Sequence, residues 1–463
     1  MAFAVVAVAI VVLVALWPSI ENAFAPPGPA PVWENVTLTS GPRVGYHPAN
    51  PFYAVVFTAA NRTTPSLLAL GNYLNSTPIT WFRYGGGGEG YDPTTQTDYL
   101  PPNGGGRFVA TPLALWNLTW FKSWCLSRTP HCDWLGYLPA ELNLTQAAVH
   151  TAEWFHSVLG FAPELWQLGN EPESWAHFGE NYTVWSTLDH SSPTPAAYAT
   201  MEANYIGAVS ALYPSDRFVG VEASCANCDT TLISASAQVG GPSLGGMAYH
   251  TYPTLPGGSS SLGQFYGALS GSVNLSSTVA QFSSSISSAC PACASVPVEL
   301  GEYQAGPHGA PSPYASGVPG ALFLAASIVQ ALRLNVSMFT VFDSGSLLNP
   351  STNLPSPEGL LYQRVLENMT MGNDYADSLG GSTVPAFSVL IENGSRESLL
   401  LVNPNVSTGF NLTIPASAFP VGSMGTARTW SNGGAFPTVT AYAALPSDFE
   451  LPPQSLLLLN NYE

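Results

Sequence analysis

The stretch Leu165-Trp-Gln-Leu-Gly-Asn-Glu-Pro-Glu-Ser-Trp175 is an apolar run that stops abruptly at a glycine and a glutamate. A second stretch, Val296-Pro-Val-Glu-Leu-Gly-Glu-Tyr-Gln-Ala-Gly306, has the same design. Short apolar runs of this kind are typical of strands that are buried in a parallel sheet. In an α/β barrel, side chains at the carboxyl ends of such strands gather at the mouth that carries the chemistry. We therefore predict two barrel strands, followed by the carboxylates Glu171 and Glu302.

Further apolar segments, separated by helical stretches, extend this pattern over about 320 residues. Eight strand–helix units in series predict a closed (β/α)8 barrel, not an open sheet. The predicted strands are Phe52–Ala59, Ile79–Tyr84, Trp134–Leu142, Leu165–Gly169, Phe218–Ala223, Gly246–Tyr252, Val296–Gly301 and Val336–Phe342.

The pattern changes after Met371, where short apolar or alternating segments lie between Gly, Pro, Asn and Ser turns. This pattern predicts a C-terminal all-β sandwich domain over residues 371–463, with the barrel over residues 44–370. Residues 26–43 form a Pro-rich linker, in which Trp33–Thr39 is predicted to add a strand to the β-domain.

The composition limits the classes of partner. Charged residues make up 9% of the 463 residues, against roughly 25% in an ordinary soluble domain. The net charge is −18, Lys122 is the only lysine, and the arginines are scattered. Nucleic acids and other polyanions are therefore excluded as partners, because they require clustered basic side chains. A surface with few charges also predicts tolerance of acid, since protonating its carboxylates creates little charge repulsion.

The N-terminus carries an uninterrupted apolar stretch, Ala2–Trp17, followed by Ala23-Phe24-Ala25. This pattern predicts either a signal peptide over residues 1–25 or membrane anchorage through residues 1–20, and both stay open. A dozen Asn-x-Ser/Thr sequons along the chain fit a glycosylated protein. We expect the protein to be secreted or held at the cell surface.

The six cysteines fall into three local pairs, Cys125/Cys132, Cys225/Cys228 and Cys290/Cys293. Two C-x-x-C pairs could form a four-thiolate zinc site. The predicted topology argues against zinc, because it places one of these pairs at the top of the barrel and the other at the bottom. In an exported protein, three local disulfides are the better interpretation.

Two carboxylates at the ends of barrel strands are the groups that glycoside hydrolysis needs. One carboxylic acid protonates the leaving oxygen and one carboxylate attacks the sugar. Glu171 lies between Asn170, whose amide can hold a substrate hydroxyl, and Pro172, which fixes the chain beyond the strand. The hypothesis from the residues is a hydrolase with Glu171 and Glu302 as its catalytic pair.

These segments resemble the clan A retaining glycoside hydrolases, and within them family 79, the heparanase and β-glucuronidase family. The resemblance covers residues from Phe52 to Asn368. It rests on Trp81-Phe-Arg-Tyr-Gly-Gly86 with Asp92-Pro93, Glu164–Trp175, Tyr249-His-Thr-Tyr252 and Leu300-Gly-Glu302.

The resemblance implies Glu171 as general acid/base and Glu302 as nucleophile, with no metal and no organic cofactor. It implies that Asn170 binds the hydroxyl beside the reacting carbon and that Arg83 supports the nucleophile. His250 and Tyr252 are expected to line the cleft.

Other polar and aromatic residues near the predicted mouth each have more than one interpretation. His250 taken alone is typical of a core histidine, whereas its pairing with Tyr252 at a strand end favours a role in the site. Glu222 ends the fifth strand and is a candidate for substrate contact. Trp175 is either a platform for a sugar or simple packing. Glu299 precedes Glu302 by three positions, so strand alternation predicts that it faces away from Glu302.

Heparanases hold a sulfated polyanion with basic clusters, which this chain lacks. Heparan sulfate is therefore a poor substrate for this chain, whereas a terminal uronic acid needs only backbone N–H groups, tyrosine hydroxyls or one arginine. The favoured hypothesis is a retaining β-glycosidase acting on β-glucuronides or uronic-acid glycans, with a carbohydrate as its only predicted partner. The alternatives are a neutral-sugar β-glycosidase of the same clan and a non-catalytic glycan-binding protein at the cell surface.

Overall fold

The computed structural model describes the larger part of the chain. The described residues are 30–39, 43–45, 53–57, 64–84, 90–92, 97–100, 109–111, 113–128, 131–140, 143–174, 193–241, 244–252, 261–270, 274–303, 314, 318–342, 347–349, 351–368, 374–376, 387–431 and 437–462. The predicted signal peptide or anchor and Trp175 lie outside these ranges. No helix within them has both the length and the apolar character needed to cross a bilayer.

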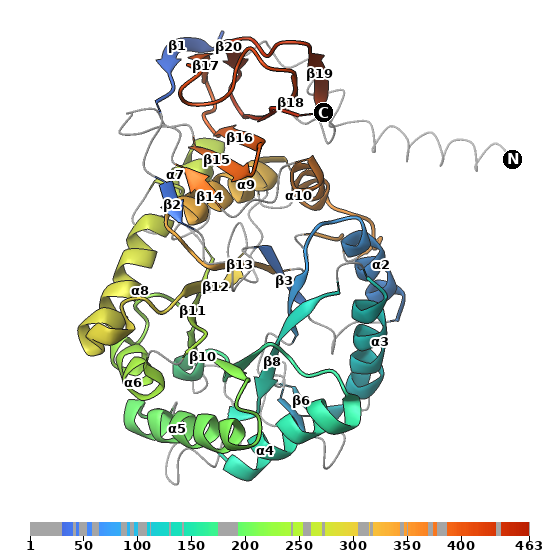
Figure 1. Cartoon of the computed structure of the whole chain (residues 1–463), viewed down its shortest axis with the longest axis vertical. Helices are drawn as coiled ribbons and strands as arrows, with labels where there is room; N and C mark the ends of the chain where they lie inside the picture. The colour runs from blue at the N-terminus through green and yellow to red at the C-terminus, as the bar shows by residue number, and fades with distance from the viewer. Residues whose placement is uncertain are drawn as a thin grey trace, which may run out of the picture.

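Eight parallel strands form a closed barrel, which confirms the predicted fold class (Figure 1). All eight predicted strands are present, with ends shifted by a few residues. They are β3 (Tyr53–Phe57), β4 (Trp81–Tyr84), β8 (Asp133–Leu138), β9 (Leu165–Leu168), β10 (Arg217–Ala223), β11 (Gly246–Thr251), β12 (Val298–Tyr303) and β13 (Met338–Phe342).

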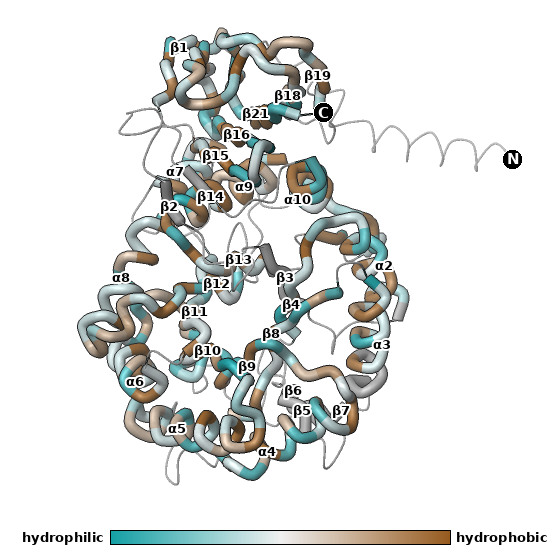
Figure 2. Tube along the Cα trace, viewed as in Figure 1, coloured by the Kyte–Doolittle hydropathy of each residue, from teal (hydrophilic) through white to brown (hydrophobic). Residues whose placement is uncertain are grey.

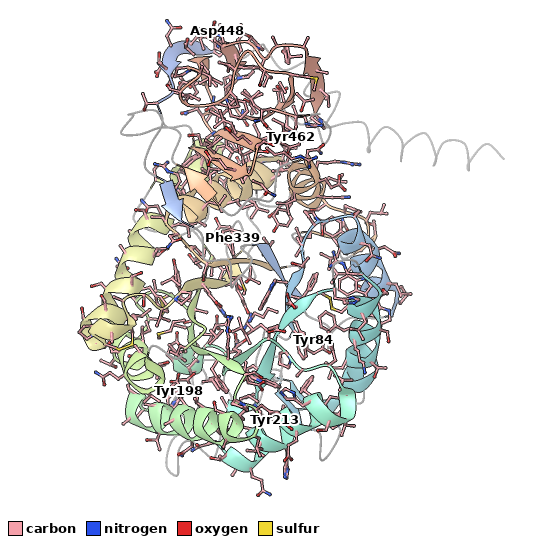
Figure 3. All side chains as sticks on the ribbon, in the orientation of Figure 1. Tyr84, Tyr198, Tyr213, Phe339, Asp448 and Tyr462 are labelled. Atoms are coloured by element: carbon pink, nitrogen blue, oxygen red, sulfur yellow. A yellow bond between two sulfur atoms is a disulfide. The ribbon has the colours of Figure 1, made fainter. Side chains whose placement is uncertain are left out.

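A ring of helices surrounds the strands (Figure 1). Its members are α2 (Thr64–Asn75), α3 (Leu113–Ser127), α4 (Thr145–Glu153), the π-helical turn η2 (Trp154–Leu159), α5 (Pro195–Leu212), α6 (Thr230–Gly240), the short α7 (Leu262–Gly267), α8 (Leu275–Ala289), α9 (Val318–Arg333) and α10 (Pro357–Asn368). The first and last helices meet, because the Tyr73 hydroxyl on α2 donates to the Gly359 carbonyl on α10 at 2.7 Å. Tyr198 on α5 (Figure 3) donates its hydroxyl hydrogen to the Leu168 carbonyl at the end of β9.

The barrel interior and the space outside the strands are two separate apolar regions. Apolar side chains from six different strands fill the interior: Trp81, Leu135, Leu165, Val219, Ala248 and Met338. A larger cluster packs between the outer faces of the strands and the helices, and buries Trp134, Trp166 and Phe339. The alternation of side chains along each strand divides the residues between these two regions.

Two elements between β4 and β8 do not follow from the predicted pattern. A small antiparallel sheet consists of β5 (Gly90–Asp92), β6 (Thr97–Leu100) and β7 (Val109–Thr111). Helix α3 follows this sheet and is apolar on several faces, with Phe121 and Cys125 buried. A helix of this kind has no clear amphipathic period, so periodicity alone does not predict it.

The C-terminal domain consists of two stacked sheets, as predicted. The larger contains β2 (Arg43–Gly45), β14 (Asp374–Ala376), β15 (Phe387–Asn393), β16 (Arg396–Asn403), β18 (Gly425–Ser431), β19 (Thr438–Tyr442) and β21 (Ser455–Asn460). The smaller contains β1 (Val32–Thr37), β17 (Thr408–Thr413) and β20 (Asp448–Leu451). Strand β1 pairs parallel with β17, and β2 pairs with β14, whereas the sequence placed residues from 44 onward in the barrel.

The central strands of the larger sheet, β16 and β21, are buried on both faces. Leu400, Val402 and Leu456 belong to the cluster shared with the barrel helices, whereas Leu399 and Leu457 belong to the core of the sandwich. Figure 2 shows apolar, brown stretches where α9 lies next to β15 and β16. Two-sided burial explains the continuous run of leucines in β21, because alternating residues enter different cores.

Three disulfides link the predicted local cysteine pairs, Cys125–Cys132, Cys225–Cys228 and Cys290–Cys293. The local-disulfide prediction is confirmed, and the four-thiolate zinc alternative is wrong because every cysteine is already bonded to another.

Candidate active site

The candidate site lies at the carboxyl ends of the barrel strands. Arg83 is near the end of β4, Glu222 near the end of β10 and His250 near the end of β11. Glu302 lies near the end of β12, and Glu171 lies in the loop after β9. The parallel strands therefore bring five residues that are far apart in sequence to one mouth.

The loop after β9 has an unusual backbone. Gly169 has a φ of 91° and Glu171 has a φ of 47°. Residues other than glycine rarely adopt positive φ. The Glu171 amide N–H donates to the Glu222 carbonyl at 2.8 Å, and the Ser174 amide donates to the Glu171 carbonyl at 2.8 Å. These bonds hold the strained residue in place, as is common for functional side chains.

A bulge in β12 turns Glu302 into the mouth. Against β11, Leu300 pairs with Tyr249 and Glu302 pairs with His250, so Gly301 is an extra residue. An added residue reverses the side-chain alternation beyond it. As a result Leu300 and Tyr303 lie in the outer core, while Glu302 points inward.

The same bulge corrects the prediction for Glu299. Glu299 pairs with Ala248 and Met338, both of which belong to the interior cluster, so its side chain also points into the barrel. Strand alternation predicted the opposite face. The prediction was wrong because the bulge inserts one residue between Glu299 and Glu302. Burial, followed by the nearby Glu222, raises the pKa of Glu299 to about 8.

Arg83 binds Glu302 and several other polar residues of the site. Its side chain has no exposed surface. Nη1 donates to Glu302 Oε1 at 2.5 Å, Nη2 to Asn170 Oδ1 at 2.6 Å, and Nε to Gln167 Oε1 at 2.9 Å. Nε also lies 3.0 Å from Glu222 Oε1. The planar guanidinium thereby fixes residues from β9, β10 and β12 relative to one another.

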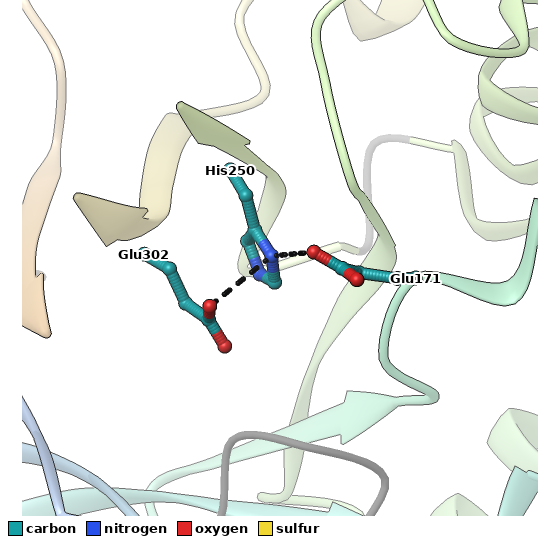
Figure 4. Close-up of side chains that lie close together, drawn as sticks. All are labelled: Glu171, His250 and Glu302. Carbon is teal, nitrogen blue, oxygen red and sulfur yellow. Dashed lines mark hydrogen bonds and ion pairs between the residues drawn. The ribbon is translucent and has the colours of Figure 1, made fainter. Parts of the chain in front are cut away.

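His250 lies between three carboxylates. Its Nδ1 is 2.5 Å from Glu171 Oε1 and 3.5 Å from Glu302 Oε2, and its Nε2 is 2.9 Å from Glu222 Oε1. Figure 4 shows the imidazole between Glu171 and Glu302. One carboxylate oxygen of Glu171, one of Glu302 and a ring nitrogen of His250 all lie within 4.8 Å of one another.

The two glutamates differ in their access to solvent. The Glu171 side chain is 15% exposed, whereas that of Glu302 is 6% exposed. Tyr252 donates its hydroxyl hydrogen to Glu302 Oε2, and Arg83 binds Oε1, so both oxygens of the nucleophile candidate are held. Glu171 is thus placed toward the open mouth, and Glu302 is fixed below it.

The charged residues of the site shift one another's pKa toward the charged form. Burial by itself would lower the pKa of His250, but Glu302 and Glu171 outweigh burial and raise the pKa to about 10. Burial would raise the pKa of Glu302, but His250 and Arg83 lower it below its ordinary value. The neighbouring charges therefore favour the ionised form of Glu302 and the protonated form of His250.

The donor set of the site does not suit a metal ion. Glu171, His250 and Glu302 are close enough to share one. However, both ring nitrogens of His250 face carboxylates, so the ring binds protons where a metal would need a lone pair. The guanidinium of Arg83 already neutralises Glu302. A further cation at this point would lie beside two positive charges.

A second set of contacts braces the loop that carries Glu171. Glu173 Oε1 accepts from the Ser224 amide at 2.5 Å and from the Ser224 hydroxyl at 2.8 Å, and Ser174 donates to Ser224 at 3.1 Å. Burial raises the pKa of Glu173. This neighbouring carboxylate therefore holds the loop after β9 against the loop after β10.

The fold of the chain is similar to that of several glycoside hydrolases of known structure. No protein-family model and no curated protein matches the sequence. A Paenibacillus polymyxa xyloglucanase of glycoside hydrolase family 44, solved with xyloglucan, has a TM-score of 0.67 at 10% identity, with 92% of this chain and 99% of that chain covered. A family 51 α-L-arabinofuranosidase from Bifidobacterium longum has a TM-score of 0.64 at 13% identity, with 94% and 99% covered.

A family 30 endoxylanase from Clostridium papyrosolvens has a TM-score of 0.57 at 10% identity, with 92% of this chain and 99% of that chain covered. These neighbours belong to the clan that the sequence resembles. At such low identity the likeness concerns the fold, and it does not single out family 79.

The structure brings together seven of the eight residues that the sequence selected, and Trp175 lies outside the described residues. Two of the seven differ from their expected roles. Glu222 was a candidate for substrate contact, and His250 was expected to line the cleft, but neither side chain has exposed surface. Both side chains are fully buried, so they can act on a substrate only through the residues that they contact.

Gln167 is a site residue that the sequence analysis missed. Its side chain accepts from Arg83 and donates through Nε2 to the Gly169 carbonyl at 2.9 Å. It lies in β9 and is 1% exposed. A polar residue within an otherwise apolar buried strand is the signal that could have found it.

Proposed function

We propose that the protein is a retaining glycoside hydrolase with Glu171 as general acid/base and Glu302 as nucleophile. The observation that carries the proposal is the approach of the two carboxylates, which have oxygens within 4.8 Å at the barrel mouth. Retaining enzymes hold their carboxyl groups about 5–5.5 Å apart, whereas inverting enzymes leave room for a water molecule.

In the first step, Glu171 gives its proton to the glycosidic oxygen and the bond from that oxygen to the anomeric carbon breaks. Glu302 forms a bond to the same carbon through a carboxylate oxygen. In the second step, water gives a proton to Glu171, and the water oxygen bonds to the anomeric carbon. The bond from Glu302 to that carbon breaks as the new bond forms, and both glutamates return to their starting states.

The surrounding residues suit these roles. Arg83 and Tyr252 each hold one oxygen of Glu302, which orients the attacking carboxylate and keeps it ionised. Asn170 is 8% exposed beside Glu171, where the resemblance expects a contact with a substrate hydroxyl. Glu171 has the greater exposure and can reach a leaving group at the mouth.

Within this reaction class we propose a neutral β-glycan as the substrate to test first. The two cations described at the mouth, Arg83 and His250, are both bound to carboxylates and have no exposed surface to offer a uronate. The structural neighbours include a xyloglucanase, an α-L-arabinofuranosidase and an endoxylanase. A β-glucuronide is the second candidate, on the strength of the resemblance to family 79.

A small panel of aryl β-glycosides tests the proposal: glucoside, xyloside, galactoside and glucuronide, assayed from acid to neutral pH. We expect release from at least one of them, or from a polymeric β-glycan, and loss of release in Glu302→Gln. Glu358→Gln is the matched control, because Glu358 is an equally buried glutamate on α10, outside the barrel mouth. Equal activity in wild type and Glu302→Gln would contradict the assignment of the nucleophile.

A covalent probe separates the enzyme from a glycan-binding protein on the same scaffold. A cyclophellitol or fluorosugar probe forms a stable ester with the nucleophile of a retaining enzyme. We expect labelling of Glu302, located by peptide mass. Glycan binding without any labelling or hydrolysis would favour the non-catalytic alternative.

We also propose that the protein is exported and reaches the cell surface or the medium. The apolar N-terminal stretch, the dozen sequons and the three disulfides support this location. N-terminal sequencing of the protein from the extracellular and membrane fractions would distinguish a cleaved signal peptide from a retained anchor. Recovery from the cytoplasm alone would contradict export.

A further inference from the structure

We propose that Glu222 is a positioning residue that fixes His250 as a cation between the two catalytic glutamates. This inference rests on the proposed function, and it gives a role to a third carboxylate that the two-glutamate mechanism does not use. Glu222 reaches neither solvent nor substrate, since its side chain has no exposed surface.

Glu222 contacts the catalytic machinery at three points. Its Oε1 accepts from His250 Nε2 at 2.9 Å and lies 3.0 Å from Arg83 Nε. Its backbone carbonyl accepts from the Glu171 amide at 2.8 Å. One residue is thus joined to the acid/base through the backbone, and to the nucleophile's two cationic partners through the side chain.

A bulge in β10 makes this arrangement possible. Against β11, Val219 pairs with Gly246 and Glu222 pairs with Ala248, so β10 has one extra residue between the two pairs. Val219 lies in the interior cluster. The bulge therefore brings Glu222 inward as well, where strict alternation would have placed it on the outer face.

Carboxylates on both sides hold the imidazole. With Glu222 at Nε2 and Glu171 at Nδ1, both ring nitrogens are in position to donate, which only the protonated ring can do. The ring cannot rotate without breaking both bonds. Among the described residues, the charged groups that act on His250 are Glu222 on β10, Glu171 after β9 and Glu302 on β12. Arg83 on β4 and Tyr252 after β11 bind the same Glu302.

A fixed cation at this place suits the movement of charge in the reaction. Glu302 is the anion before the first step, and Glu171 becomes the anion when it has given up its proton. His250 Nδ1 lies 2.5 Å from Glu171 and 3.5 Å from Glu302. The imidazolium is therefore beside the negative charge in both states and need not move between them, which is electrostatic preorganisation.

Glu222→Gln tests the proposal while keeping the volume of the side chain. We expect kcat to fall at least about tenfold, with KM changed by less than about threefold, because Glu222 stabilises charge and does not touch substrate. Glu222→Asp should recover part of the lost kcat. Glu358→Gln controls for the loss of a buried carboxyl elsewhere, and thermal unfolding shows whether each variant is folded.

The titration of His250 is the readout that a purely structural role would not move. In protein labelled with ¹⁵N-histidine, the ring signals of His250 are assigned by their absence from His250→Asn. We expect them to titrate at least about one pH unit lower in Glu222→Gln than in wild type, because the ring loses an anionic partner. Glu358→Gln should leave this titration unchanged.

Three outcomes would overturn the proposal. They are unchanged kcat in Glu222→Gln, a rise in KM without a fall in kcat, and a fall in kcat while His250 titrates as in wild type. Failure of the proposed function is distinct from these. Wild-type protein without activity on any glycan would overturn the hydrolase, and the titration would still decide whether Glu222 holds His250 protonated.

Discussion

A β-carbon built on Gly301 would lie 1.9 Å from Oε1 of Glu222. The carboxylate of Glu222 thus occupies the space that any other residue at position 301 would fill. Gly301 is also the extra residue of the bulge that turns Glu302 toward the mouth. One glycine therefore both orients the nucleophile and makes room for the group that holds His250.

Gly301→Ala should displace the Glu222 carboxylate, because a carbon and an oxygen that are not bonded to each other cannot approach to 1.9 Å. We expect kcat to fall at least about tenfold, and stability to fall by about 1–3 kcal/mol, as for other overpacked core positions. Steady-state kinetics and thermal unfolding measure the two effects. Gly207→Ala is the matched control: a β-carbon there meets nothing within 4 Å, and alanine should stabilise helix α5 slightly. A fully active Gly301→Ala enzyme would show that Glu222 can move without cost.

Tyr252→Phe should weaken the nucleophile without disturbing the fold. The change removes one hydrogen bond to the ionised Glu302 and leaves the ring in place. A hydrogen bond to a charged group contributes about 1.5–3 kcal/mol, which corresponds to a fall of about 10–150-fold in kcat/KM. Tyr213→Phe, whose ring stacks on His156 away from the mouth, should retain full activity. Equal losses in the two variants would point to general damage.

Glu171→Ala should separate the two chemical steps. Without its acid the enzyme can still cleave aryl glycosides whose leaving group needs no proton, but it cannot activate water in the second step. We expect a burst of phenol release followed by slow turnover, and azide should speed turnover by trapping the covalent intermediate as a glycosyl azide. Rapid-mixing kinetics with activated and unactivated aryl glycosides provide the measurement. An Ala variant that shows no preference for the activated substrate would argue against the assignment of the acid.

The protein should be most stable at mildly acid pH. Burial is the main cause that raises the pKa of Glu202, Glu299 and Glu358 from 4.5 to about 8. Between these values the folded state holds protons that the unfolded chain has released. The free energy of unfolding should therefore fall as pH rises from about 4.5 to about 8, and these groups contribute most in acid.

Two other groups set the limits of this range. The pKa of His250 is raised from 6.5 to about 10, so its contribution is full below pH 6.5 and is lost as pH rises toward 10. The pKa of Glu302 is lowered, so its contribution is lost as pH falls below 4.5. Thermal unfolding as a function of pH tests the sum, and Glu202→Gln should flatten the slope above pH 4.5. A stability maximum above neutral pH would contradict this account.

Local sequence determined the strands and the identity of the catalytic candidates. The apolar runs of β9 and β12 and the residues that follow them are visible without coordinates, because burial of a parallel strand demands apolar residues along its length. Glu171 and Glu302 follow from this pattern, whereas Arg83 and Tyr252 follow from the resemblance alone. The leucine run of β21 also indicated a strand, although its two-sided burial was not evident.

Which way the buried carboxylates point was decided by the tertiary structure alone. The bulges at Gly301 and between Val219 and Glu222 are set by pairing with neighbouring strands, and no residue pattern along one strand specifies an extra residue in its partner's register. For this reason strand alternation predicts the wrong face for Glu299, and the sequence does not reveal that Glu222 is buried against His250. The sequence by itself determined which chemical groups reach the barrel mouth, because strand ends are local; closure of the barrel decided which of them touch, because those contacts join residues far apart along the chain.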